Sequence, residues 1–252
     1  MGSERIEVIG LTGLPEITSG DDLAELVLEA CRRDGLQLVD GDVVVVTQKV
    51  VSKQEGCVVA LSSVEPSHVA AAFATHADKD PRLVELALRE AKRVVRMDRG
   101  VLITETRHGF VCANSGVDAS NVGSPDAATT LPLEPDASAE RLRRAIHGAT
   151  GAGIAVIISD TFGRPWREGV VNVAIGIAGL NPLNDYRGQT DADGRSLAST
   201  VISVADELAG AAELVMGKLD RIPAAVVRGF EFTVGDEGAG SLVRDAARDL
   251  FR

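Results

Sequence analysis

Short apolar runs recur along this chain, and helical patterns separate them. Runs of this length that are rich in Val and Ile predict strands. The candidate strands are RIEVIGL, DVVVVTQ, GCVVAL, GVLITET, FVCA, IAVIIS, GVVNVAIGIAG and PAAVVRG. Helices are predicted to begin near Asp21, Pro81, Ser138, Thr200 and Ser241. The alternation of strands and helices indicates an α/β fold.

The pattern favours a single unit of 252 residues with two lobes. Residues 123–138, which read GSPDAATTLPLEPDAS, are predicted to form a loop that links or covers the two halves. The chain has no GxxxxGK[ST] motif, and no GxGxxG motif lies between a strand and a helix. If the protein binds nucleotide phosphates, it therefore uses neither a P-loop nor a Rossmann turn.

The composition argues against several classes of protein. A formal net charge of −11 without a long basic run disfavours nucleic-acid binding. No apolar run reaches the roughly 18 to 20 residues of a membrane span, and no secretory signal is recognisable, so we expect a cytoplasmic protein. Cys31, Cys57 and Cys112 are far apart and lie in no CxxC motif, which argues against disulfides and a zinc site. An acidic protein that binds phosphates must attract them with local cations.

Two polar clusters follow predicted strands in the first part of the chain. Residues 13–16, GLPE, form a tight turn that a structural role alone can explain. Lys49 and Lys53 follow four consecutive valines, which are typical of a strand buried on both faces. Open α/β sheets place ligand contacts at such strand ends, although a solvated strand end explains the lysines equally well. We expect Lys53 to point into a cleft and Lys49 to lie on the solvated side of the bend.

A third cluster, ANSGVDASNVG at residues 113–123, places Asp118 three residues before Asn121. This arrangement suits a metal ligand followed by a hydrogen bond to a base or ribose. Turn chemistry among these small residues is the simpler alternative when the cluster is considered alone.

The fourth cluster, ISDTFGRPWREG at residues 158–169, follows a buried strand that is expected to end at Asp160 and Thr161. Carboxylate and hydroxyl oxygens suit Mg²⁺ or Mn²⁺ rather than zinc. Arg164 and Arg167 lie in the predicted turn, where they would clamp a phosphate or carboxylate. A strand that ends in an Asx turn is the alternative explanation.

Two other segments bear on the site and the assembly. Residues 204–220 predict an amphipathic helix on which Asp206, Glu207 and Glu213 form a solvated face. The uncharged run at residues 169–179 must be buried in the core or against another subunit. None of the four histidines has a catalytic partner at a recognisable spacing.

Taken in order, several motifs resemble the coenzyme F-420 γ-glutamyl ligase family. They are GLPEI, DVVVVTQKVVSKQEG, LITETRHGFVCANSGVDASNVG, ISDTFGRPWREGVVNVAIGIAG, YRGQTDADGR and VADELAGAAELVMGKL followed by AVVRG. The similarity runs from about residue 6 to residue 232, and SGVDASNVG and SDTFGRPWREG are specific together. It implies a mixed-sheet, two-lobed ligase fold, a homodimer, and a single ligase unit over residues 1–252 without the flavin-binding C-terminal domain of fused relatives.

The resemblance implies a GTP-dependent ligase that adds L-glutamate to the lactyl-phosphate carboxyl of the deazaflavin F-420 precursor. The reaction would pass through an acyl phosphate and release GDP and phosphate. The implied GTP contacts are Leu14, Pro15, Glu16, Ile17, Gln48, Lys53 and Asn121, with Gln48 standing where relatives carry Ser. Two divalent ions, Mg²⁺ or Mn²⁺, would be held by Asp118, Asp160 and Thr161. K⁺ is a further candidate ion. Asp118, Asp160 and Arg164 are the implied catalytic residues.

Two other functions remain open from the residues alone. The same carboxylates and Thr161 would also suit a metal-dependent phosphohydrolase. A nucleotide-binding regulatory module would bind GTP without consuming it.

The segment around Lys218 is not assigned to the metal site, because an ammonium group cannot ligate a metal.

Overall fold

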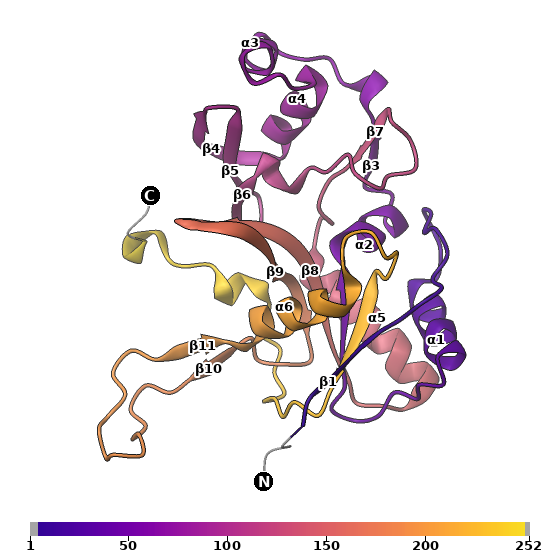
Figure 1. Ribbon diagram of the computed structural model, residues 1–252, viewed down its shortest axis with the longest axis vertical. Helices are drawn as coiled ribbons and strands as arrows, with labels where there is room; N and C mark the ends of the chain where they lie inside the picture. The colour runs from indigo at the N-terminus through magenta and orange to yellow at the C-terminus, as the bar shows by residue number, and fades with distance from the viewer. Residues whose placement is uncertain (1–4, 250–252) are drawn as a thin grey trace.

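The structure is a computed structural model that describes residues 5–249, arranged in a larger and a smaller lobe (Figure 1). A five-stranded mixed sheet forms the centre of the larger lobe. Its strands lie in the order β1 (Glu7–Gly10), β12 (Ala224–Arg228), β2 (Val43–Thr47), β8 (Ala155–Arg164) and β9 (Arg167–Ala178). Only β2 and β8 are parallel neighbours in this sheet. All four valines of β2 are fully buried, as predicted for a strand covered on both faces.

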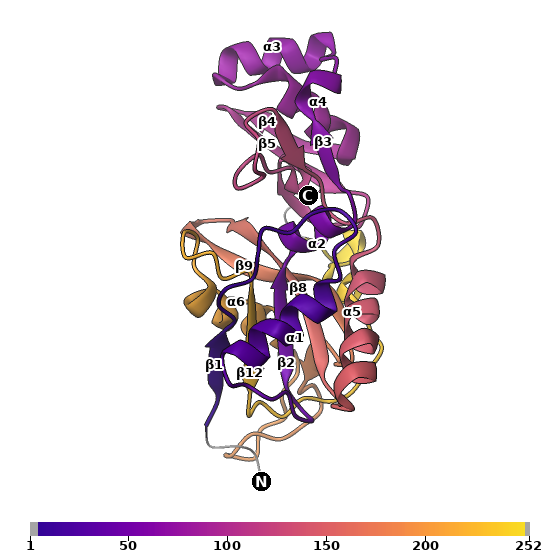
Figure 2. The same cartoon turned by 90° about the vertical axis from the view of Figure 1, so that its right-hand side faces the viewer.

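Helices cover both faces of this sheet (Figure 2). α1 (Leu23–Arg33) and α5 (Pro135–Thr150) lie on one face, and α6 (Val204–Met216) lies on the other. The N-terminus of α5 comes very close to β9 at Gly176, where a Cβ atom would lie 2.5 Å from the carbonyl oxygen of Pro135. Glycine is therefore required at this crossing.

The smaller lobe is built from the middle of the chain. It contains a two-stranded sheet of β3 (Val58–Ala60) and β7 (Ala127–Thr129), and a three-stranded sheet of β4 (Ala91–Asp98), β5 (Val101–Thr106) and β6 (Val111–Ala113). α3 (His68–Ala77) and α4 (Pro81–Glu90) pack beside the three-stranded sheet around a small core that includes Leu102. The segments before β3 and after β7 connect this lobe to the main sheet.

The predicted α/β class is confirmed, and each predicted strand coincides with a strand of the structure. Helices near the predicted starts at Asp21 and Pro81 are also confirmed, while α5 begins at Pro135 rather than Ser138. The predicted helix from Thr200 begins later, because residues 201–203 form β11 (Val201–Ser203) and pair with β10 (Leu183–Asp185). Within the 123–138 segment, residues 127–129 form β7 rather than loop.

Three expectations about the elements are wrong. The stretch after β2 is not a bend, because α2 (Gln48–Gln54) begins directly at the end of the strand. β8 does not end at Asp160, because the pairing with β9 continues to Arg164. At Ser241 there are only short 3₁₀ turns, η3 (Ala239–Leu242) and η4 (Ala246–Arg248). Residues 244–248 are all exposed, so a helix there would gain no apolar burial.

The remaining expectations concern cysteines, membranes and the uncharged run. Cys31, Cys57 and Cys112 are free, and only Cys57 is not fully buried. Among residues 5–249, no helix combines the length and the apolar character needed to cross a bilayer. From Ala174 to Ala178 the uncharged run is buried in the core of the monomer, whereas Val170 at its start is exposed.

Candidate active site

A cavity of about 640 Å³ lies between the loop after β1, the β2–α2 junction, the loop around Asp118, the β8–β9 pair and the end of α6. Most of the residues expected to form the site line it. These are Leu14, Pro15, Glu16, Ile17, Gln48, Lys53, Asp118, Asn121, Asp160 and Thr161. The fold thus brings together the four polar clusters that lie far apart in the sequence.

Lys53 lies on α2 and points into the cavity, as expected. Its side chain is buried, and its ammonium forms an ion pair with the carboxylate of Glu16. The same ammonium donates a hydrogen bond to the carbonyl oxygen of Asn121 at 2.7 Å. Lys53 therefore ties the Leu14–Ile17 loop to the Asp118–Gly123 loop across one wall of the cavity.

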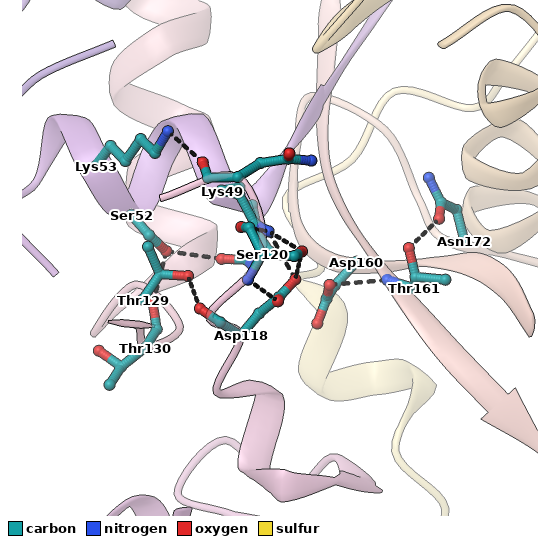
Figure 3. A network of polar contacts seen from close by, with 12 residues as sticks. Lys49, Ser52, Lys53, Asp118, Ser120, Thr129, Thr130, Asp160, Thr161 and Asn172 are labelled. Atoms are coloured by element: carbon teal, nitrogen blue, oxygen red, sulfur yellow. Dashed lines mark hydrogen bonds and ion pairs between the residues drawn. The ribbon is translucent and has the colours of Figure 1, made fainter. Parts of the chain in front are cut away.

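The expectation that Lys49 lies on the solvated side is wrong. Its Nζ lies 2.6 Å from Oδ2 of Asp118 and 2.9 Å from Oγ of Ser120, and its side chain is 15% exposed. The cause is helix α2, since residues four apart in a helix lie on the same face. Lys49 and Lys53 therefore both face the cavity (Figure 3).

Asp118 is held in one orientation by its own loop. The backbone N–H of Ser120 donates to Oδ1 of Asp118 at 2.7 Å, and the backbone of Asp118 pairs with that of Thr129. Burial alone would raise the pKa of Asp118, but the hydrogen bonds from Lys49 and Ser120 outweigh it and lower the pKa below its usual value. Asp118 is therefore an ionised carboxylate at neutral pH.

Asp160 on β8 has a different environment. Burial, with a smaller contribution from the charge of Asp118, raises the pKa of Asp160 to about 6. Its Oδ1 accepts a hydrogen bond from the backbone N–H of Thr161 at 2.8 Å, and Asp160 forms no ion pair within residues 5–249. A carboxylate with a raised pKa in a cavity, close to a second carboxylate, is typical of a functional site.

Thr161 belongs to a polar chain that crosses from β8 to β9 and α6. Its hydroxyl donates to Oδ1 of Asn172 at 2.9 Å, and Nδ2 of Asn172 donates to Oε2 of Glu213 at 2.9 Å. The expectation that Glu213 lies on a solvated face is wrong, because Glu213 lines the cavity. Asn172 also lines the cavity, and the sequence analysis did not identify it. The one feature of the sequence that could have indicated Asn172 is its position as a polar residue within an uncharged, largely apolar run.

Arg164 does not line the cavity. It pairs with Arg167 at the end of the β8–β9 hairpin, and its Nη2 donates to the carbonyl oxygen of Glu168 at 2.7 Å. Because β8 continues past Asp160, the four further residues carry Arg164 roughly 13 Å along the strand at about 3.3 Å per residue. The structure therefore does not bring the two arginines to the carboxylates.

The donor atoms of the cavity fit a hard divalent cation. No group of three or more His, Cys, Asp or Glu residues suited to a metal occurs in the described part of the chain. Asp118, Asp160 and Thr161 offer two carboxylates and one hydroxyl. Mg²⁺ is bound in this way, through one or two carboxylates, with water and substrate phosphates completing its coordination. Mn²⁺ accepts the same oxygen donors.

Comparison with known proteins shows the family of this chain. Residues 12–229 match the family model described as F420-0:Gamma-glutamyl ligase. The chain is 47% identical to the coenzyme F420:L-glutamate ligase of Methanothermobacter thermautotrophicus, over 98% of this chain and 99% of that protein. It is 46% identical to the protein of the same name from Methanopyrus kandleri and 41% identical to that from Methanocaldococcus jannaschii, in each case over 98% of this chain and 97% of the relative. This chain belongs to the F420-0:gamma-glutamyl ligase family.

Proposed function

We propose that this protein is a coenzyme F420:L-glutamate ligase. In the proposed reaction, GTP drives the addition of L-glutamate to the lactyl-phosphate carboxyl of the deazaflavin precursor. The observation that carries the proposal is the cavity itself, where Asp118 and Asp160 meet Lys49 and Lys53 in a chain of this family. A reaction among three anionic reactants needs such a site, because charge must be neutralised and the reactants held in line.

The nucleotide phosphates would bind at the β2–α2 wall. Lys49 and Lys53 supply ammonium groups from α2, and the chain has no P-loop that would supply backbone N–H groups instead. The loop at residues 14–17, together with Gln48 and Asn121, would contact the rest of GTP. Lysine binds phosphate as a compact point charge, which suits two ammonium groups that are held in place by neighbouring carboxylates.

Divalent cations would bind next to this wall, at Asp118, Asp160 and Thr161, and Asp118 would exchange its ion pair with Lys49 for a cation. Mg²⁺ or Mn²⁺ would supply positive charge beside the transferred phosphoryl group. Two ions are proposed, with the oxygens of GTP completing their coordination, and K⁺ is a further candidate. Because Asp118 is ionised and Asp160 has a pKa of about 6, both carboxylates can accept cations at neutral pH.

The proposed reaction has two steps, phosphoryl transfer and amide formation. A carboxylate oxygen of the precursor attacks the γ-phosphorus of GTP, which forms an acyl phosphate and releases GDP. The α-amine of glutamate then attacks the carbonyl carbon, which forms the amide, releases phosphate and gives up a proton. The residues of this chain position the anions, neutralise their charge and shield the acyl phosphate from water. Arg164 lies outside the cavity, so it has no role in this proposal.

Mass spectrometry of the precursor after incubation with GTP, Mn²⁺ and L-glutamate tests the function. The expected product carries one or more added glutamyl residues, and GDP should form only when both acceptors are present. Steady phosphate release from GTP alone would favour a phosphohydrolase instead. Binding of GTP without turnover under any combination of acceptors would favour a regulatory module.

We propose that the protein is a homodimer, and this proposal rests on the family alone. Much of the uncharged run is buried within the monomer, so its burial does not depend on a second subunit. Val170 near the β8–β9 hairpin is exposed and would take part in such a contact. Light scattering at micromolar concentration should give the mass of a dimer, and a monomeric mass would reject the proposal.

A further inference from the structure

Three side chains from different elements form a hydrogen-bonded chain that ends at the cavity. Thr161 comes from β8, Asn172 from β9 and Glu213 from α6. Asn172 is 3% exposed, and the pairing of β8 with β9 places it directly opposite Thr161. We call these three residues the Thr161–Asn172–Glu213 relay (Figure 3 shows Thr161 and Asn172).

The direction of each hydrogen bond follows from Glu213. The carboxylate oxygen of Glu213 accepts a hydrogen bond, and the amide nitrogen of Asn172 donates it at 2.9 Å. That nitrogen also lies 3.5 Å from Oγ of Ser159. The opposite amide orientation would place the carbonyl oxygen of Asn172 against the Glu213 carboxylate. Glu213 thereby fixes the carbonyl oxygen of Asn172 toward Thr161.

This orientation determines what the Thr161 hydroxyl can do. A hydroxyl has one hydrogen and two lone pairs, and here the hydrogen is donated to Asn172. The hydroxyl therefore cannot donate to the neighbouring carboxylate of Asp160. Its lone pairs remain free to accept a donor or to ligate a cation.

We propose that Asn172 and Glu213 are positioning residues, which turn the Thr161 hydroxyl into an oxygen ligand for a divalent cation bound at Asp160. The inference rests on the cation site of the proposed function. Residues behind a metal ligand commonly fix its orientation, and their loss typically costs about 10- to 100-fold in metal affinity. Glu213 would thus contribute through Thr161 rather than by touching the cation.

The same helix provides a matched control. Glu207 on α6 is exposed, so Glu207→Ala removes one negative charge from the helix without touching the relay. Asp206 is unsuitable as a control, because its carboxylate accepts a hydrogen bond from the backbone N–H of Ala174 at 2.9 Å. A general effect of charge on Mn²⁺ binding would appear in Glu207→Ala as well as in Glu213→Ala.

The test is Mn²⁺ affinity, measured by electron paramagnetic resonance on the full chain without substrates. We expect Glu213→Ala to weaken binding about tenfold or more. Glu213→Gln should stay within about threefold of wild type, because the Gln side-chain oxygen can still accept from Asn172. In a Thr161→Val background, Glu213→Ala should have little further effect, which is the signature of two residues that act as one unit.

Two results would overturn the inference while leaving the cation site intact. Equal losses in Glu213→Gln and Glu213→Ala would mean that the charge of Glu213 acts directly. Additive losses in the double variant would mean that Glu213 does not act through Thr161. If Asp160→Asn leaves Mn²⁺ affinity unchanged, the cation site of the proposed function fails, and the relay fails with it. Circular dichroism of each variant checks that the fold is retained.

Discussion

The charged groups on the two walls of the cavity differ in whether they form ion pairs. On the β2–α2 wall, called the α2 wall below, Lys49 is paired with Asp118 and Lys53 with Glu16. On the β8–β9 wall, Asp160 has no ion pair within residues 5–249, and burial raises its pKa to about 6. The fold neutralises one wall internally and leaves a negative charge poorly compensated on the other.

This difference indicates what each wall can bind. The lysines of the α2 wall can exchange their carboxylate partners for phosphate oxygens, so this wall suits an anion. The β8–β9 wall gains stability from any cation that reaches Asp160, because this partly buried carboxylate forms no ion pair within residues 5–249 and the charges of Lys218 and Lys49 do not offset its desolvation. A nucleotide that arrives with a divalent cation satisfies both walls together.

The largest predicted effect is the loss of ligation in Asp160→Asn. The change keeps the shape of the side chain and removes the charge that attracts the cation. We expect glutamate addition to fall by roughly 100-fold or more, equal to about 3 kcal/mol. The measurement is the initial rate of glutamyl product by mass spectrometry, with Glu207→Gln as the control. Near-wild-type turnover of folded Asp160→Asn at low Mn²⁺ would break the contrast between the walls.

The second prediction concerns the two lysines. Lys53→Ala removes a charge-assisted hydrogen bond worth about 1.5 to 3 kcal/mol, so GTP affinity should fall roughly 10- to 100-fold. Because Lys49 also faces the cavity, Lys49→Ala should weaken binding by about tenfold rather than leave it intact. Lys53→Arg should restore only part of the loss, since a planar fork does not replace a point charge.

Calorimetric titration with a non-hydrolysable GTP analogue measures these affinities. Arg5→Ala, at an exposed position that does not line the cavity, is a control for the loss of one positive charge. Wild-type affinity in Lys49→Ala would mean that Lys49 serves only to orient Asp118. Wild-type affinity in Lys53→Ala would remove the phosphate from the α2 wall.

The third prediction is that Asp160→Asn stabilises the empty protein above pH 6. The folded-state pKa of Asp160, about 6, is above the ordinary value of 3.8. The protonated carboxyl therefore contributes stability that is fully present below pH 3.8 and is lost as the pH rises through 6. The variant avoids this loss, so its advantage should be near zero at pH 4 and reach about 1 to 2 kcal/mol at pH 8.

Urea unfolding of both proteins at pH 4, 6 and 8 measures this difference. A constant advantage at all pH values would mean that the substitution acts through packing rather than charge. A variant less stable than wild type at pH 8 would show that Asp160 already has an adequate positive partner.

The smallest predicted effect is at Arg164. Because it lies at the hairpin end and outside the cavity, Arg164→Ala should change GTP affinity by no more than about twofold. The same calorimetric titration measures it. A much larger loss would place a guanidinium in the site of the assembled protein, as the family resemblance implied.

Much of the fold could be predicted because the pattern of apolar residues reports it locally. The four valines of β2 predict a central strand. Asp21 and Asp22 at the start of the helical pattern and Gly35 just after it predict α1. The sequence did not predict α2, because VVSK at residues 50–53 extends an apolar run that is typical of a strand. In the structure these residues belong to the helix. β4 was missed because AKRVVRMD has few buried side chains and continues directly from α4.

The site could be predicted in part for a similar reason. The motifs SGVDASNVG and SDTFGRPWREG together indicated Asp118 and Asp160 through their resemblance to the family, and both residues line the cavity. Lys49 and Glu213 were misassigned because their positions depend on helices packing against the sheet. Asn172 was missed because only the β8–β9 register sets it opposite Thr161.

The most direct test of the contrast between the two walls is anomalous diffraction from crystals grown with Mn²⁺ and a non-hydrolysable GTP analogue. We expect a manganese peak within about 2.0 to 2.3 Å of carboxylate oxygens of Asp160 and Asp118. We also expect phosphate oxygens beside the ammonium groups of Lys49 and Lys53. A manganese ion bound away from Asp160, or phosphates that leave both lysines paired with Asp118 and Glu16, would contradict this contrast.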